Sequence, residues 1–181
     1  MITPGVLGDT HVPDRARQLH PEIMPCFREA GVQAILHAGD ISTQPVLTAL
    51  GTIAPVHAVR GNRDWLLRHL PLSLELNLDG IKIALTHGHG GMMQYLRDKP
   101  RWLFYTYKHE RLVPRLLAAF PAADVIVFGH GHLPLNQQTG RQLLFNPGTP
   151  LYQRRRNLAP SIGLLRLFAG GQVEGQIVEL D

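Results

Sequence analysis

Cysteine is almost absent from this sequence of 181 residues, in which Cys26 stands alone. An internal disulfide and a zinc site built on a Cys-x-x-Cys pair are therefore excluded, so a metal would need histidine, aspartate and asparagine ligands. The sequence also lacks any apolar run near the roughly 18 residues that a membrane span needs, and its first residues show no charged signal segment. We therefore expect a soluble, cytoplasmic protein with no membrane partner.

Charged residues are sparse as well, at 18% of the chain, and the net charge of +4 is not gathered into one long basic tract. This distribution favours a phosphate-bearing substrate, and nucleic acid as a partner is compatible with it but not required by it. Hydrophobic residues make up 44% of the chain, which at this length is enough for one compact core without stabilising disulfides or structural metal ions. We expect residues 1–181 to form a single domain, either alone or as a homo-oligomer.

Short apolar runs and short amphipathic segments alternate along the chain, which indicates an α/β fold. The predicted strands are residues 2–8, 34–38, 55–59, 74–78, 81–85, 125–128, 143–145, 162–168 and 173–180. The predicted helices are residues 22–30 and 44–50. Asp79-Gly80 is a strong two-residue turn signal, so it should join two of these strands into a hairpin.

Two histidines emerge together where the apolar run 125–128 ends, in the sequence Gly129-His130-Gly131-His132. Ligands of open α/β sheets gather outside the carboxyl ends of the strands, so these imidazoles are well placed to bind a metal. A surface turn is the alternative for this motif taken alone, because the chain contains 10 histidines. The other strand ends decide between the two interpretations.

Further ligand-type side chains follow other predicted strands. They are Asp9 and His11 after the first strand, Asp40 after the second, Asn62 after the third and His87 after residues 81–85. Carboxylate, imidazole and amide donors together suit a divalent transition ion. Each turn alone is weak support, since Asp, Asn and Gly are common turn residues. His37, just before this turn of the second strand, is expected to be a structural core residue.

The order and spacing of these motifs over nearly the whole chain resemble the calcineurin-like metallophosphoesterases, in particular their small single-domain bacterial and archaeal phosphodiesterases. The retromer scaffold subunit is similar to the same branch. The resemblance implies two mixed β-sheets packed as a sandwich with helices on the outer faces. It implies two divalent ions, manganese being expected and nickel, zinc or iron being alternatives. The implied ligands are Asp9, His11 and His132 for one ion, Asn62, His87 and His130 for the other, and Asp40 bridging both.

The activity implied by the resemblance is hydrolysis of a phosphodiester through in-line attack by a metal-bridging hydroxide. The substrate would be a small phosphodiester or a nucleotide, and a nuclease is a variant of the same activity. The alternative from another class is a non-catalytic, protein-binding scaffold of the same fold. Loss of ligand histidines would mark such a scaffold, and none is missing here.

Four other residues are candidates for contact with the substrate. Arg63 stands where many superfamily members have a histidine, and a guanidinium can bind phosphate but is a poor proton donor; the alternative is that it turns outward toward Asp64. His89 is expected to orient phosphate or to support a neighbouring ligand, or else to be a polar loop residue. Thr149 and Arg154 are candidates for substrate binding, although three consecutive arginines starting at Arg154 are also typical of a solvated turn.

Residues 92–119 interleave aromatic and basic side chains more densely than the rest of the chain. We expect two helices broken around Pro100, forming a lid-like insert beside the site. The alternatives are that the aromatic side chains pack on a sheet, or that they stack on a nucleotide. Substrate choice is expected to depend on this segment.

Overall fold

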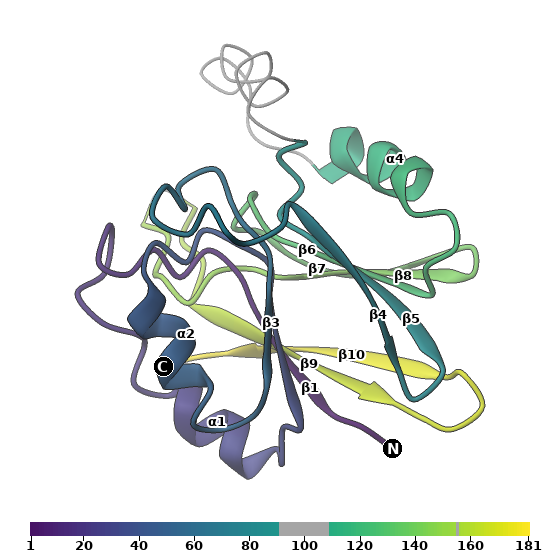
Figure 1. The fold of residues 1–181 in the computed structure, drawn as a ribbon, viewed down its shortest axis with the longest axis horizontal. Helices are drawn as coiled ribbons and strands as arrows, with labels where there is room; N and C mark the ends of the chain where they lie inside the picture. Colours follow the sequence, from purple (N-terminus) through teal and green to yellow (C-terminus); the bar gives the residue numbers. More distant parts are fainter. Residues whose placement is uncertain (91–108, 155) are drawn as a thin grey trace.

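Two five-stranded β-sheets pack face to face in the computed structural model, which describes residues 1–90, 109–154 and 156–181 (Figure 1). In the first sheet the strand order is β10-β9-β1-β2-β3. Its strands are β1 (Pro4–Leu7), β2 (Ala34–His37), β3 (Val56–Ala58), β9 (Ser161–Leu167) and β10 (Val173–Glu179). The first three are parallel, while β9 and β10 form an antiparallel hairpin on the other side of β1.

The second sheet is also mixed and has the order β4-β5-β6-β8-β7. Its strands are β4 (Ser73–Leu78), β5 (Ile81–Thr86), β6 (Val125–Phe128), β7 (Pro134–Thr139) and β8 (Gln142–Pro147). Strands β5, β6 and β8 are parallel, and β4 and β7 run antiparallel to them at the two edges. The expected sandwich of two mixed sheets is therefore confirmed.

The main core lies between the sheets and consists of short apolar runs whose side chains point inward. Val6 and Leu36 of the first sheet meet Ile83, Val127 and Phe145 of the second, and all are buried. Fully burying such a side chain stabilises the fold by about 1.5–3 kcal/mol. This interface fixes how the two sheets, and therefore the loops at their ends, lie relative to each other.

Helices cover the two outer faces. Helices α1 (Ile23–Glu29) and α2 (Gln44–Leu50) pack on the first sheet through residues such as Phe27 and Leu50. Helix α2 begins after Thr43, has a proline in its first turn and ends at Gly51, as helix start and stop signals favour. Helix α4 (His109–Ala119) packs on the second sheet through Leu112 and Leu116.

Most of the helices and strands match the elements predicted from the sequence, and one strand was not predicted. Asp79 and Gly80 both have positive φ values, 54° and 86°, and form the predicted two-residue turn between β4 and β5. Strand β7, Pro-Leu-Asn-Gln-Gln-Thr, was not predicted because it is an edge strand with mostly polar, exposed side chains. Helix α4 confirms helical structure in part of the 92–119 segment, whereas the break at Pro100 lies outside the described residues.

None of the helices that the structure describes is long and apolar enough to cross a membrane.

Candidate metal centre

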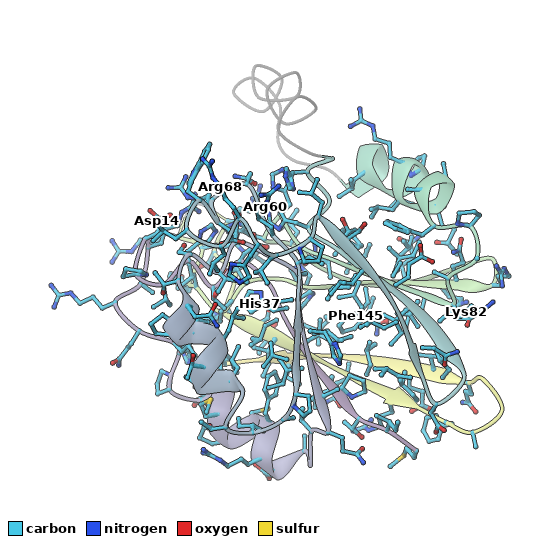
Figure 2. The ribbon with its side chains drawn as sticks, in the orientation of Figure 1. Asp14, His37, Arg60, Arg68, Lys82 and Phe145 are labelled. Atoms are coloured by element: carbon cyan, nitrogen blue, oxygen red, sulfur yellow. The ribbon has the colours of Figure 1, made fainter. Side chains whose placement is uncertain are left out.

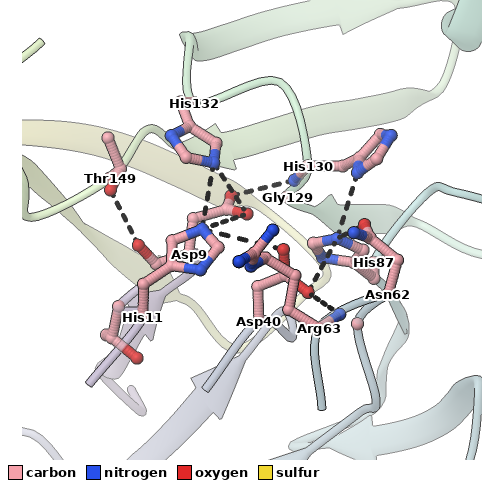
Figure 3. Close-up of polar contacts among 12 residues, drawn as sticks. Asp9, His11, Asp40, Asn62, Arg63, His87, Gly129, His130, His132 and Thr149 are labelled. Carbon is pink, nitrogen blue, oxygen red and sulfur yellow. Dashed lines mark hydrogen bonds and ion pairs between the residues drawn. The ribbon is translucent and has the colours of Figure 1, made fainter. Parts of the chain in front are cut away.

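All seven predicted ligands meet at one end of the two sheets (Figure 3). The register of the parallel strands explains why, because Leu7, His37 and Ala58 pair across β1, β2 and β3 just before their loops begin. In the second sheet Thr86 of β5 pairs with Phe128 of β6 in the same way. The loops after these strands therefore start side by side, and their polar side chains converge.

The first ligand group consists of Asp9, His11 and His132. The Nε2 atoms of His11 and His132 are 3.2 Å apart, and His132 Nε2 is 3.3 Å from Asp9 Oδ1. Two ligand atoms that each lie about 2.1 Å from a shared ion, at the angles of tetrahedral or octahedral coordination, are about 3.0–3.4 Å apart. Both distances fall in that range, while the third, from His11 Nε2 to Asp9 Oδ1, is longer at 3.9 Å. The three side chains together could hold one ion after a small adjustment of Asp9 or His11.

The second ligand group consists of Asn62, His87 and His130. His87 Nε2 lies 3.1 Å from Asn62 Oδ1 and 3.1 Å from His130 Nδ1. The opposite ring nitrogen of His87 lies 2.7 Å from the carbonyl oxygen of Ala38, which can only accept, so Nδ1 carries the hydrogen. In the neutral ring Nε2 then presents a lone pair beside the amide oxygen, and a cation between these atoms would relieve their repulsion.

Asp40 lies between the two groups. Its Oδ2 is 3.7 Å from His11 Nε2, and its Oδ1 is 3.5 Å from His87 Nε2. The main-chain N–H of Arg63 donates to the same Oδ1 at 2.8 Å, which fixes the orientation of the carboxylate. One carboxylate therefore presents one oxygen to each group.

The pKa shifts of Asp9 and His11 in the first group suit metal ligation. Burial lowers the pKa of His11 to about 3, with His132 and Arg15 acting in the same direction, so its imidazole is neutral at pH 7. Burial alone would raise the pKa of Asp9, but His132, His87 and His11 outweigh it and hold that pKa well below its usual value. A neutral imidazole and an ionised carboxylate are the forms that bind metals.

In the second group, the pKa values of two histidines shift in opposite directions. Burial favours a low pKa for His87, but the carboxylates of Asp40 and Asp9 outweigh it and raise that pKa. Burial also lowers the pKa of His130 well below its ordinary value, with the charge of His87 acting in the same direction. The raised pKa of His87 favours a proton at the position where a cation would bind, and metal binding would displace such a proton.

Backbone strain is concentrated at this site. Five of the predicted ligands have positive φ values: Asp9 (55°), His11 (49°), Asp40 (54°), His130 (73°) and His132 (56°). Such conformations cost of order 1–3 kcal/mol each for residues other than glycine and persist only where surrounding contacts enforce them. The ligand geometry is therefore imposed by the loops.

Glycines let the ligand loops approach one another closely. A Cβ atom on Gly61 would lie 2.1 Å from Asp40 Oδ1, and one on Gly39 would lie 2.9 Å from His87 Nδ1. No side chain fits at either position. The Gly-Asp and Gly-Asn motifs thus reflect crowding between neighbouring loops as well as turn geometry.

Asp64 joins two of the ligand loops and was not recognised as doing so from the sequence. Its side chain is buried, and Oδ1 accepts from the main-chain N–H groups of Ile41 and Ser42, both at 2.7 Å. Its Oδ2 accepts from Gly61 N–H at 2.7 Å. The aspartate three residues after a turn glycine was the available signal, since such side chains commonly accept local main-chain hydrogen bonds.

The guanidinium of Arg63 pairs with Asp14 rather than with Asp64, which corrects the alternative considered for it. Arg63 Nε donates to Asp14 Oδ2 at 2.6 Å, and Nη2 donates to Oδ1 at 3.0 Å. Asp14 Oδ2 also lies 3.7 Å from His11 Nδ1. The pair therefore links a candidate substrate-contacting residue to a candidate metal ligand, although no sequence pattern connects positions 14 and 63.

Side chains from β8 and from the loop after it hold the double-histidine loop after β6 in place. Asn146 Nδ2 donates to the carbonyl of Gly129 at 3.0 Å. Arg156 Nη1 donates to the carbonyl of Gly131 at 3.0 Å, and the side-chain amide of Gln153 donates to the carbonyl of His132. These contacts orient the double-histidine loop, and none of the three was predicted from the sequence.

The other predicted site residues lie in different surroundings. Thr149 is fully buried, and its hydroxyl donates to the carbonyl of Asp9 at 2.8 Å, so it supports the first ligand loop. His89 is buried, with its ring centroid 5.2 Å from that of His87. Arg154 is exposed in the turn after β8. The predicted substrate contacts of these residues stay predictions, while His37 is a buried core residue whose Nε2 lies 3.1 Å from Thr10 Oγ1.

The calcineurin-like phosphoesterase superfamily domain matches residues 2–167, and the chain belongs to this superfamily. A probable metallophosphoesterase of Methanothermobacter thermautotrophicus is 34% identical over 178 residues, which cover 96% of this chain and 90% of the relative. Phosphodiesterase YfcE of Escherichia coli is 29% identical over 164 residues, covering 79% of this chain and 77% of the relative. The chain is thus a phosphoesterase of a metal-dependent family.

A solved structure with the same fold is wild-type Vps29 of Entamoeba histolytica in complex with Zn²⁺. It aligns with a TM-score of 0.74 over 98% of this chain and 99% of that chain, at 21% sequence identity. At this identity the likeness shows the fold alone. It agrees with the two mixed sheets and outer helices described above.

Proposed function

We propose that this protein is a metal-dependent phosphodiesterase with a dinuclear centre. The observation that carries the proposal is the position of Asp40, whose two oxygens face His11 of the first group and His87 of the second. A carboxylate shared in this way can hold two cations close together while neutralising part of their repulsion. The first group, the second group and Asp40 would then hold the two ions as the family resemblance implies.

Bound divalent ions would supply an activated water nucleophile and would hold an oxygen of the phosphoryl group. The mixture of imidazole nitrogen and carboxylate or amide oxygen suits manganese, and it also accommodates nickel, zinc or iron. Asp9 and Asp40 contribute the negative charge that favours two cations. The main-chain N–H of Arg63 and the hydroxyl of Thr149 keep the Asp40 side chain and the Asp9 loop in place.

Arg63 is proposed to contact a phosphate oxygen of the substrate. Its pairing with Asp14 leaves the guanidinium close to the site while limiting how far it can turn away. A guanidinium stays charged at any usable pH, so it can stabilise phosphoryl charge but cannot protonate a leaving group. His89 beside the second group, and the exposed Arg154, are further proposed contacts for the phosphoester.

The test is hydrolysis of bis(p-nitrophenyl) phosphate by metal-stripped protein, with Mn²⁺, Ni²⁺, Zn²⁺, Fe²⁺ or Mg²⁺ added back. Wild type should regain activity, and Asp40→Asn should lose about 100-fold or more, because a metal site contributes several kcal/mol of transition-state stabilisation. Asp124→Asn is the matched control, since this carboxylate contacts Lys82 N–H and Arg141 near the start of β6. Its activity should equal that of wild type.

The competing function is that of a non-catalytic scaffold of the same fold. Tight metal binding by wild type without hydrolysis of any phosphodiester under these conditions would favour it. Unchanged metal stoichiometry and turnover in Asp40→Asn would instead overturn the dinuclear assignment.

A further inference from the structure

A cavity of ≈ 300 Å³ adjoins the second ligand group. It is lined by Arg60, Asn62, Trp65, Arg68 and His89, among others. Asn62 is also the residue whose side-chain oxygen lies 3.1 Å from His87 Nε2. A molecule in the cavity would therefore continue directly from a phosphate held at the ligand groups. Its volume is at the lower end of the range for small-ligand pockets.

The charge of the cavity favours an anion. Within residues 1–90, 109–154 and 156–181, neither Arg60 nor Arg68 forms an ion pair with a carboxylate, and Arg60 Nη1 donates to the carbonyl of Arg68 at 3.3 Å. Figure 2 shows the two arginines at the end of the sheets that also carries Asp14. Asp64 is the carboxylate in the lining, and both of its oxygens accept main-chain N–H bonds. Two guanidinium groups therefore remain available to a negatively charged ligand.

The cavity also presents an aromatic surface. Trp65 is 58% exposed, although tryptophan is a residue that folded proteins bury to a high degree on average. The guanidinium carbon of Arg68 lies 5.7 Å from the centroid of its ring, close enough for a cation–π contact. Indole and guanidinium planes together form the type of platform on which nucleobases stack.

We propose that this cavity binds a nucleotide arm of the substrate, with the base on Trp65 and a second phosphate between Arg60 and Arg68. The inference rests on the proposed function and narrows it, because the scissile phosphodiester would then join a nucleotide carrying a further phosphate to its leaving group. Hydrolysis of that diester adds water across one P–O bond. It releases the leaving group as an alcohol and the nucleotide arm as a phosphate monoester.

Three esters with the same p-nitrophenol leaving group test the proposal. They are methyl p-nitrophenyl phosphate, thymidine 5′-(p-nitrophenyl phosphate), and the latter ester with an additional 3′-phosphate. Wild type should show kcat/KM rising in that order. Trp65→Ala should reduce the advantage of the thymidine ester over the methyl ester about 10-fold, as alanine substitution at a base-stacking residue does. Because the three esters share a leaving group, the ratio of kcat/KM between two esters is unaffected by a change in a variant that slows hydrolysis of all three equally.

Arg68→Ala should abolish most of the extra advantage given by the 3′-phosphate, and Arg68→Lys should restore part of it. Arg141→Ala is the matched control, because this exposed arginine contacts Asp124 and the carbonyl of Pro121 and lies outside the cavity. Its ratios should equal those of wild type. Equal kcat/KM for the methyl and thymidine esters, or unchanged ratios in both Trp65→Ala and Arg68→Ala, would overturn the proposal.

A binding measurement separates this proposal from the proposed activity. Calorimetric titration of metal-free wild type with thymidine 3′,5′-bisphosphate should show saturable binding that Trp65→Ala and Arg68→Ala weaken. Binding of this kind without hydrolysis of any ester would support nucleotide binding in the cavity and would overturn the proposed phosphodiesterase activity. Hydrolysis of all three esters without such binding would support the proposed phosphodiesterase activity and would overturn nucleotide binding in the cavity.

Discussion

Asp64→Asn is the change that should most sharply reveal how the ligand loops are held. The carboxylate accepts three main-chain hydrogen bonds, all at 2.7 Å, from Ile41, Ser42 and Gly61. These bonds join the loop of Asp40 to the loop of Asn62. An asparagine has one side-chain oxygen and one amide group, so it can satisfy at most the two donors on one side.

The expected loss in the free energy of unfolding follows from these three hydrogen bonds. With the asparagine oxygen facing Ile41 and Ser42, its NH₂ group would face the N–H of Gly61, and one buried donor would lose its partner. A hydrogen bond to a charged group contributes about 1.5–3 kcal/mol, and leaving a buried donor unsatisfied costs about 1–3 kcal/mol. We therefore expect the free energy of unfolding of the metal-free protein to fall by roughly 2–4 kcal/mol.

Urea unfolding followed by circular dichroism would measure the loss, and calorimetric titration with Mn²⁺ would measure metal affinity. Affinity should fall about 10- to 100-fold, as it does when residues that orient metal ligands are removed. Asp124→Asn provides the control, because its partly exposed carboxylate accepts one main-chain bond from Lys82. A loss in Asp64→Asn no larger than in this control would refute the argument that Asp64 joins the two loops.

Three other changes have expected outcomes. Burial lowers the pKa of His37 from 6.5 to about 4, so between these pH values the unfolded chain binds more protons than the folded one. The free energy of unfolding therefore decreases as the pH is lowered, and His37 should account for about 2 kcal/mol of the loss from pH 7 to pH 5. Urea titrations at both pH values should show a smaller difference for His37→Gln, and an equal difference would contradict this. Because Arg63 cannot protonate an alkoxide, rates for a diester series should depend steeply on leaving-group pKa, aryl esters exceeding alkyl esters by about 10²- to 10⁴-fold; a flat series would reveal an acid elsewhere. Arg156→Ala removes the bond to the carbonyl of Gly131 and should weaken Mn²⁺ binding about 10-fold by calorimetry, whereas Arg166→Ala, which loses one exposed bond to Gln176, should not.

The ligand positions could be predicted from the sequence because each one is measured from the end of a strand. Val125–Phe128 is an apolar run whose end is visible in the sequence, and the observed strand has those limits. Asp9, Asp40 and His130 each follow such a run, and parallel pairing in register brings the ends together. The strand pattern in the sequence was therefore sufficient to predict that these side chains lie near one another. It could not give β7, where polar side chains alternate without an apolar face.

The supporting contacts could not be predicted because they depend on the shape of loops rather than on their starting points. Arg63 and Asp14 are paired across 49 positions of the sequence, and Asp64 was considered as the partner because it is adjacent. The positive φ values of Asp9, His11 and Asp40 turn each loop in a direction that residue type alone does not indicate. Those same turns bring Asp14 within 3.7 Å of His11 and leave Asp64 buried between two loops. The strained backbone and the buried carboxylates are therefore connected. The loops adopt costly conformations because buried hydrogen bonds fix them, and the predicted metal ligands are oriented as a consequence.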